Sequence, residues 1–341
     1  MPRLVKEEEI SIYRNDSSYV VPTGSLTRLG TNELLLTFRE APRRGSLSHV
    51  DPESTAVLLR SADGGRTWGS KTLIYADPDP HCGVQDPSLA VLADGTLIAS
   101  FFKWRTGAET DLPPDPPPGR YVRKGPLGLP LAWVDGVYVL RSWDGGRTWE
   151  HTPIPVITPL GRAATTSDPV LELPDNDLLL PGHGIRPDGS DVAFVIRSSD
   201  GGESWGSYVE VATEANGVIF MEPSIVSLPS GRLLAMFRTR GSQGGGHLFQ
   251  AESDDGGLTW RPPWKTPLWG CPPQLLMLDS GNLLCVYGYR RKPFGVRTCL
   301  STDEGRTWDP ANETILFDEG GSEDLGYPAC VQLADGEVLV A

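Results

Sequence analysis

Two repeated patterns and the residue composition predict an all-β chain that folds as a six-bladed β-propeller with four-stranded antiparallel blades. The 341 residues include 39 Gly, 31 Pro and 10 Trp. The sequence has no long stretch with the apolar periodicity of a helix, and its composition favours many short strands joined by turns. We therefore expect residues 1–341 to form a single propeller domain.

The first pattern is an octapeptide of the form S-x-D-x-G-x-T/S-W. In a hairpin turn its Asp carboxylate accepts backbone N–H bonds, its Gly takes a positive φ, and its Trp packs between neighbouring sheets. We assign its aspartates a structural role and no catalytic one: Asp63, Asp144, Asp200, Asp255 and Asp303. The copies are SADGGRTW (61–68), SWDGGRTW (142–149), SSDGGESW (198–205), SDDGGLTW (253–260) and STDEGRTW (301–308).

The second pattern reads as strand, polar turn, strand, and predicts the two inner strands of each blade. Six copies predict six blades, with each octapeptide at the turn between two outer strands. The chain ends with the sixth copy, so we expect the N-terminal segment EISIYR (9–14) to supply an outer strand that closes the ring. Either blade six is incomplete or the true C-terminus is longer. The copies are PTGSLTRLGTNELLLTFR (22–39), DPSLAVLADGTLIASFFK (86–103), DPVLELPDNDLLLPGH (168–183), EPSIVSLPSGRLLAMFR (222–238), PPQLLMLDSGNLLCVYGYR (272–290) and YPACVQLADGEVLVA (327–341).

Blade two contains an insertion rich in Pro and Gly, KWRTGAETDLPPDPPPGRYVRKGPLGLPLAW (103–133), between its second inner strand and its third strand. Loops of this length are usually functional or disordered. We expect this insertion to act as a lid or as a contact in a homo-oligomer, rather than to be a disordered loop.

Charge and cysteine content restrict the partners. A net charge of −14 argues against nucleic acid or an anionic membrane surface, because basic side chains drive such binding. The sequence has neither a membrane-helix stretch of about 20 apolar residues nor a signal-peptide core, so we expect a soluble cytoplasmic protein. Its five cysteines form no C-x-x-C pair, which indicates neither a disulfide framework nor a zinc site. We expect no metal and no cofactor.

In a propeller, residues just before each first strand and just after each second strand gather around one mouth of the central funnel. The aligned repeats bring acids to the first position and bases to the second. This arrangement is either a rim of salt bridges between blades or a site for an anionic or heavily hydroxylated ligand. A sugar fits the second interpretation. The first set is Val20 and Val21, Asp86, Asp168, Glu222, Pro272, and Tyr327 with Glu323 and Asp324, and the second is Arg39, Lys103, His183, Arg238, Arg290 and Arg291.

These motifs resemble the Asp-box (BNR repeat) sialidase/neuraminidase superfamily over nearly the whole chain. The resemblance implies retaining, exo-acting hydrolysis of terminal sialic acids by a Tyr nucleophile, a Glu that activates it, an Asp acid/base and three clamp arginines. By position, Tyr327 resembles the nucleophile, Glu222 its partner and Arg238 the second clamp arginine. Arg290 or Arg291 resembles the third. Asp51, in SHVDPES, resembles the acid/base, and Asp86 resembles an aspartate that lines the pocket.

One position departs from the family pattern. Sialidases open blade one with Tyr-Arg-Ile-Pro, whose arginine is the first clamp residue, whereas this chain has Tyr19-Val20-Val21-Pro22. Losing a charge-assisted bidentate contact to a buried charge costs on the order of 2–5 kcal/mol, unless Arg39, Arg43 or Arg44 replaces it. The sequence therefore predicts a sialidase-like glycoside hydrolase that is not a standard sialidase.

Three alternatives stay open. Within the hydrolase class, the reaction could be inverting, with Glu222 as base for a water and Asp51 as acid. His49, beside Asp51, could share the proton transfer or be a surface histidine. From another class, the chain could be a non-catalytic carbohydrate-binding or scaffold propeller, because a fold does not determine a function.

Overall fold

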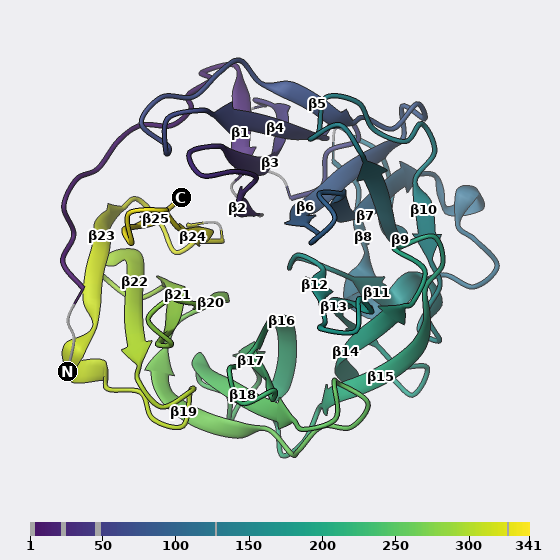
Figure 1. Ribbon diagram of the computed structural model, residues 1–341. Helices are drawn as coiled ribbons and strands as arrows, with labels where there is room; N and C mark the ends of the chain where they lie inside the picture. Colours follow the sequence, from purple (N-terminus) through teal and green to yellow (C-terminus); the bar gives the residue numbers. More distant parts are fainter. Residues whose placement is uncertain (1–3, 22–24, 45–48, 127, 326) are drawn as a thin grey trace.

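The computed structural model describes residues 4–21, 25–44, 49–126, 128–325 and 327–341. It shows antiparallel sheets arranged around a central axis, as in a β-propeller (Figure 1). The prediction of six blades is wrong, because the described residues form five blades of four or five strands and a separate sheet of only two strands.

The blades follow one another along the chain. Blade one contains β1 (Ser18–Val21), β2 (Leu26–Arg28), β3 (Leu34–Pro42), β4 (Thr55–Ser61) and β5 (Thr72–Tyr75). Blade two contains β6 (Cys82–Val91), β7 (Leu97–Gly107), β8 (Val122–Lys124), β9 (Leu131–Ser142) and β10 (Ile154–Val156). Blade three contains β11 (Ala164–Thr165), β12 (Leu171–Glu172), β13 (Leu178–Ile185), β14 (Asp191–Ser198) and β15 (Gly206–Thr213).

The remaining blades are built without the extra short strands. Blade four contains β16 (Ile219–Ser227), β17 (Leu233–Arg240), β18 (His247–Ser253) and β19 (Trp264–Trp269). Blade five contains β20 (Pro273–Met277), β21 (Leu283–Tyr289), β22 (Phe294–Ser301) and β23 (Thr314–Gly320). The two-stranded sheet is β24 (Cys330–Gln332) with β25 (Val338–Val340). Four 3₁₀ turns lie between strands: η1 (Glu109–Asp111), η2 (Gly119–Tyr121), η3 (Gly161–Ala163) and η4 (Pro310–Asn312).

The predicted closure by the N-terminal strand is also wrong. Residues 9–14 form no strand, and the first strand of the chain, β1, pairs with β3. Side-chain contacts hold this segment instead, because the Tyr13 hydroxyl donates to Glu40 Oε1 at 3.0 Å. Further upstream, the Leu4 carbonyl accepts from Thr314 Oγ1 at 3.0 Å. The segment therefore passes outside β24 and β25 in the ring (Figure 1) without adding a strand to them.

The octapeptides form the turns that the sequence predicts. Asp255 Oδ1 accepts from the backbone N–H of Thr259 at 2.9 Å and Oδ2 from its hydroxyl at 2.5 Å. The same two contacts recur at Asp63, Asp144, Asp200 and Asp303. In the strand register, Leu233 lies opposite the first octapeptide residue, Ser253, while Arg238 is five residues further along β17. The octapeptides thus lie at the end of the blades away from Arg238.

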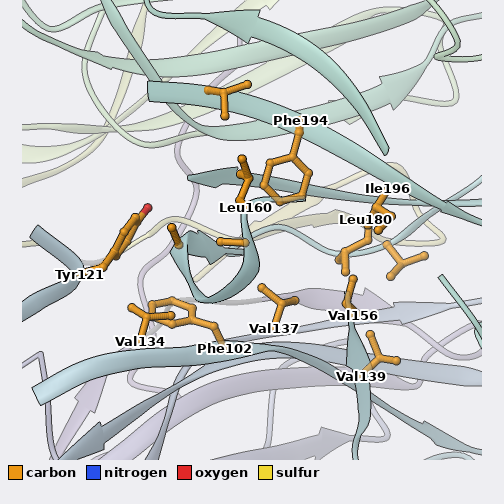
Figure 2. Close-up of a cluster of buried hydrophobic side chains, with 14 of the residues drawn as sticks. Phe102, Tyr121, Val134, Val137, Val139, Val156, Leu160, Leu180, Phe194 and Ile196 are labelled. Carbon is orange, nitrogen blue, oxygen red and sulfur yellow. The ribbon is translucent and has the colours of Figure 1, made fainter. Parts of the chain in front are cut away.

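The blade-two insertion is anchored on the propeller. Its β8 pairs with the start of β9, and Tyr121 is 5% exposed in a cluster of buried side chains between blades two and three. Figure 2 shows Tyr121 in this cluster with Phe102, Val134 and Leu160. A role as lid or oligomer contact stays a prediction.

No helix in the described part of the chain is long and apolar enough to cross a membrane. All five cysteines are free thiols, including Cys285 and Cys299, which are opposite each other on β21 and β22.

Candidate functional site

The side chains of Tyr327, Glu222 and Arg238 meet at the blade end away from the octapeptide, called the mouth below. The Tyr327 hydroxyl donates to Glu222 Oε1 at 2.6 Å. One guanidinium nitrogen of Arg238, Nη1, donates to both Glu222 oxygens at 3.0 Å. Glu222 is 7% exposed. The resemblance implied this contact between a phenol and a carboxylate, although 105 residues separate the two in sequence.

An irregularity of β16 places Glu222. The register with β17 shifts between Met221 and Ser224, and Glu222 has a φ of 48°. Blade two repeats this geometry, because the register of β6 shifts between Gln85 and Ser88 and Asp86 has a φ of 46°. Such bulges redirect a side chain, and the two carboxylates interact electrostatically.

The surroundings of Glu222 and Tyr327 separate their protonation states. Burial alone would raise the pKa of Glu222, but the Arg238 charge, followed by His183, holds the pKa below its ordinary value. Burial, followed by the Glu222 charge, raises the pKa of Tyr327 well above its ordinary value. At neutral pH an ionised carboxylate therefore accepts a hydrogen bond from a protonated phenol.

His183 supports the backbone of Glu222. Its Nδ1 accepts from the Glu222 N–H at 3.4 Å, and its Nε2 lies 3.1 Å from Thr165 Oγ1. Burial lowers the pKa of His183 to about 4, so the ring is neutral at pH 7. Its ring contacts with Thr165 and the Glu222 backbone make it a positioning residue for Glu222.

Arg39 and Asp86 lie beside the pair. Arg39 is fully buried, and its Nη1 donates to Gln85 Oε1 at 2.8 Å and to the His49 carbonyl at 2.9 Å. Gln85 Nε2 in turn donates to Asp86 Oδ1 at 2.6 Å. Burial, followed by the Glu222 charge, raises the pKa of Asp86 to about 7. Asp86 can therefore hold or release a proton near neutral pH.

The structure distinguishes the two candidates for the third clamp arginine. Arg290 Nε donates to the Cys271 carbonyl at 3.0 Å, and its Nη1 lies 3.8 Å from Asp324. Asp324 also pairs with His49 Nε2 at 3.1 Å. Arg291 instead stacks over the Trp269 ring, 3.6 Å from its centroid. Arg290 faces the network at the mouth, and Arg291 does not.

Lys103 does not join the site, contrary to the sequence alignment. Gln85 in blade two is equivalent to Met221 in blade four, because each directly precedes the bulged acid. Phe102 lies opposite Gln85 and Arg238 lies opposite Met221, so the residue equivalent to Arg238 is Phe102 and Lys103 is one residue further along β7. A shift of one residue turns a strand side chain to the other face. Lys103 Nζ lies 2.7 Å from Asp77, 3.7 Å from Asp135 and 4.1 Å from the Tyr138 ring centroid.

Asp168 is also displaced. Asp86 directly follows Gln85, the residue opposite Phe102, and Glu222 directly follows Met221, the residue opposite Arg238. In blade three the residue opposite His183 is Thr165, and Asp168 lies three residues after it. Its carboxyl group hydrogen-bonds Ser224 of the next blade, and burial raises the pKa of Asp168 to about 8. It connects blades three and four.

Comparison with known proteins places the chain among its relatives. The BNR repeat-like domain family matches residues 129–340. The chain belongs to this sialidase-like superfamily.

Two curated relatives of this BNR repeat-like chain are sialidases. The chain is 23% identical to one from Bacteroides fragilis over 95% of its own length and 59% of the relative's. It is 28% identical to one from Micromonospora viridifaciens over 76% of its own length and 38% of the relative's. The chain thus spans less than two thirds of either sialidase.

Solved structures share the fold. A protein of unknown function from Dyadobacter fermentans has a TM-score of 0.85 at 30% identity, with 100% of this chain and 94% of that chain covered. A Hadza microbial sialidase has a TM-score of 0.68 at 22% identity, with 95% of this chain and 63% of that chain covered.

Two features separate this BNR repeat-like chain from the sialidase pattern. Val20 packs against the buried cluster of blade one that contains Leu36 and Phe38, and Pro22 lies outside the described residues. Asp51, 4% exposed, accepts from Arg44 Nε at 2.9 Å and from the Glu53 N–H at 2.9 Å. Asp51 is therefore already paired with Arg44.

Sequence reasoning missed Arg240. It follows Arg238 by two residues on β17, so both side chains leave the same face of the strand. The R-T-R pattern of residues 238–240 carried this signal. In the described part of the chain, no group of three or more His, Cys, Asp or Glu is placed to bind a metal ion.

Proposed function

We propose that this chain is a sialidase-like glycoside hydrolase that acts on a sugar at the funnel mouth, with Tyr327 as nucleophile and Glu222 as its base. The observation that carries the proposal is the 2.6 Å hydrogen bond from Tyr327 to Glu222, which Arg238 keeps ionised. A phenol with an ordinary pKa of about 10 is a poor nucleophile unless a base accepts its proton. Tyr is a recognised nucleophile in sialidases.

In the proposed reaction, Tyr327 Oη attacks the anomeric carbon while its proton moves to Glu222. The bond to the leaving group breaks, and an acid protonates the departing oxygen. Water then attacks the anomeric carbon of the sugar attached to Tyr327 and gives a proton to the conjugate base of that acid. The Tyr327–sugar bond breaks as Glu222 returns its proton to the phenolate oxygen. Asp86, with its pKa near neutrality, supports the role of acid better than Asp51, which is paired with Arg44.

The same two departures support the second candidate, a carbohydrate-binding propeller without catalysis. Val20 provides no charge for a sugar carboxylate, and the Arg44–Asp51 ion pair occupies the carboxylate that resembles the family's acid/base. The basic and acidic groups at the mouth would then bind a sugar without breaking a bond.

The test is turnover of a panel of aryl glycosides that includes a sialoside, uronides and deoxy-sugar glycosides. We expect the chain to cleave one of the uronides or deoxy-sugar glycosides well and the sialoside poorly. Tyr327→Phe should abolish turnover with little loss of binding, because the change removes one oxygen and keeps the ring. Binding of sugars without turnover of any glycoside would favour the second candidate, and efficient sialoside cleavage would contradict the argument from Val20.

A further inference from the structure

We propose that Arg240 on β17 and Arg123 in the blade-two insertion form an anion subsite beside the Tyr327–Glu222 pair, selecting a sugar with a carboxylate or sulfate group. The inference rests on the proposed function in taking the ligand to be a sugar. Its own support is the arrangement of guanidinium groups.

The strand fixes the position of Arg240. Arg238 and Arg240 leave the same face of β17, and Arg238 contacts Glu222 at 3.0 Å. β17 runs from the octapeptide end of the blade towards the mouth, so Arg240 is the next side chain outward. Its charge interacts with both Glu222 and Tyr327.

The Arg240 side chain is exposed. Within the described ranges it forms no direct ion pair and no side-chain hydrogen bond, and Glu222 acts on it only at a distance. Desolvation by surrounding groups, followed by the Arg238 charge, lowers the pKa of Arg240. Arg232, at the other end of the strand, contrasts with it, because Arg232 pairs with Glu252 and Glu304. The positive charge at the mouth is therefore left for a ligand to neutralise.

The insertion holds a second group of arginines close by. Tyr121 is buried (Figure 2) with its hydroxyl 3.4 Å from Thr165, the residue that contacts His183. Arg120 pairs with Asp191, and the Arg123 guanidinium lies 4.4 Å from the Trp104 ring centroid. Both arginines interact electrostatically with Arg240. These anchors hold the insertion arginines within electrostatic range of Arg240.

Two buried donors have no acceptor. The Nε atoms of Arg238 and Arg120 form no hydrogen bond to any described residue. Buried donors are nearly always paired in native proteins. Carboxylates and sulfates have several acceptor oxygens and fit the guanidinium fork. An anionic sugar substituent is the chemistry that this cluster recognises.

The experiment measures equilibrium binding to the full chain by calorimetry at constant low ionic strength. The probes are inorganic sulfate, D-galacturonate and D-galactose; the two sugars share ring stereochemistry and differ in charge. We expect sulfate and galacturonate to compete for one site and galacturonate to bind about tenfold more tightly than galactose. Arg240→Gln should weaken both anions about tenfold without changing galactose binding, and Arg123→Gln should weaken them less.

The matched control is Arg66→Gln. Arg66 is an exposed arginine in the first octapeptide, which belongs to blade one and lies away from Arg240 in blade four. Arg66→Gln should leave all three affinities unchanged. The proposal is overturned if neither anion binds, if galactose binds as tightly as galacturonate, or if Arg240→Gln behaves like the control. Anion binding retained in Tyr327→Phe, with no turnover of any glycoside by the native chain, would remove the hydrolase proposal and leave the subsite.

Discussion

Asp86 and Glu222 have the same unusual backbone conformation in two different blades, with φ angles of 46° and 48°. Each residue precedes a proline, a position that favours extended backbone. A left-handed residue of this kind costs on the order of 1–3 kcal/mol and persists where surrounding structure enforces it, often at functional sites. The two carboxylates are close enough to interact, because the charge of Glu222 adds to burial in raising the pKa of Asp86.

Asp86 should make stability depend on pH. Its pKa rises from an ordinary value of 3.8 to about 7 in the fold, through burial and then the Glu222 charge. A raised carboxyl pKa contributes stability below pH 3.8, and this contribution is lost as pH rises to about 7. Asp86→Asn, which mimics the protonated form, should therefore melt higher than the native chain at pH 8 by about 2–4 °C for each kcal/mol relieved.

Thermal unfolding at pH 4 and pH 8 tests this expectation. The gain from Asp86→Asn should be small at pH 4 and largest at pH 8. An equal change at both pH values would show that the carboxyl does not titrate in this window.

Lys103 should stabilise the fold without affecting ligand binding. It lies between Asp77 and Asp135 with its side chain 10% exposed. Lys103→Met leaves two buried carboxylates without this partner, which should cost roughly 3 kcal/mol. Denaturant unfolding and sugar binding should be measured together, with Arg14→Met as control, because its pair with Asp16 is exposed and contributes at most about 1 kcal/mol. Weaker sugar binding at unchanged stability would return Lys103 to the site.

The octapeptide aspartates should stabilise the fold at neutral pH and lose this effect in acid. The Thr259 hydrogen bonds lower the pKa of Asp255 to about 2 from 3.8. A lowered pKa contributes stability above pH 3.8, which is lost as pH falls through about 2. Asp255→Asn should therefore destabilise the chain at pH 7, and the difference should shrink between pH 4 and pH 2. The neighbouring Asp254→Asn, whose partner Arg261 is exposed, should have little effect, and activity should not change in either variant.

Sequence reasoning succeeded where residue type and position in the repeat coincide. Glu222, Arg238 and Tyr327 were placed from their distance to predicted strands, and they meet in the structure. It failed where one residue changed the register. Lys103 lies one residue after Phe102, the position equivalent to Arg238. Asp168 lies three residues after the residue that pairs with the second strand, whereas Asp86 lies one residue after it. An octapeptide repeat does not encode such local offsets.

The blade count failed for a different reason. The sixth inner pair is present as β24 and β25. Residues 9–14 form no ladder with these two strands, and Tyr13 instead donates a hydrogen bond to Glu40. Apolar alternation in a terminal segment predicts that it packs, and does not specify which backbone it pairs with. Arg240 was missed because only the residue directly after the aligned strand was considered.

The central claim is that Tyr327 is the nucleophile, and trapping its covalent intermediate tests it most directly. The chain would be incubated with a fluorinated, activated analogue of the aryl glycoside that it cleaves best, then digested and analysed by mass spectrometry. The account predicts one sugar attached to the peptide that contains Tyr327, and none in the Tyr327→Phe variant. A sugar on any other residue, or a product of inverted configuration with no adduct, would contradict it.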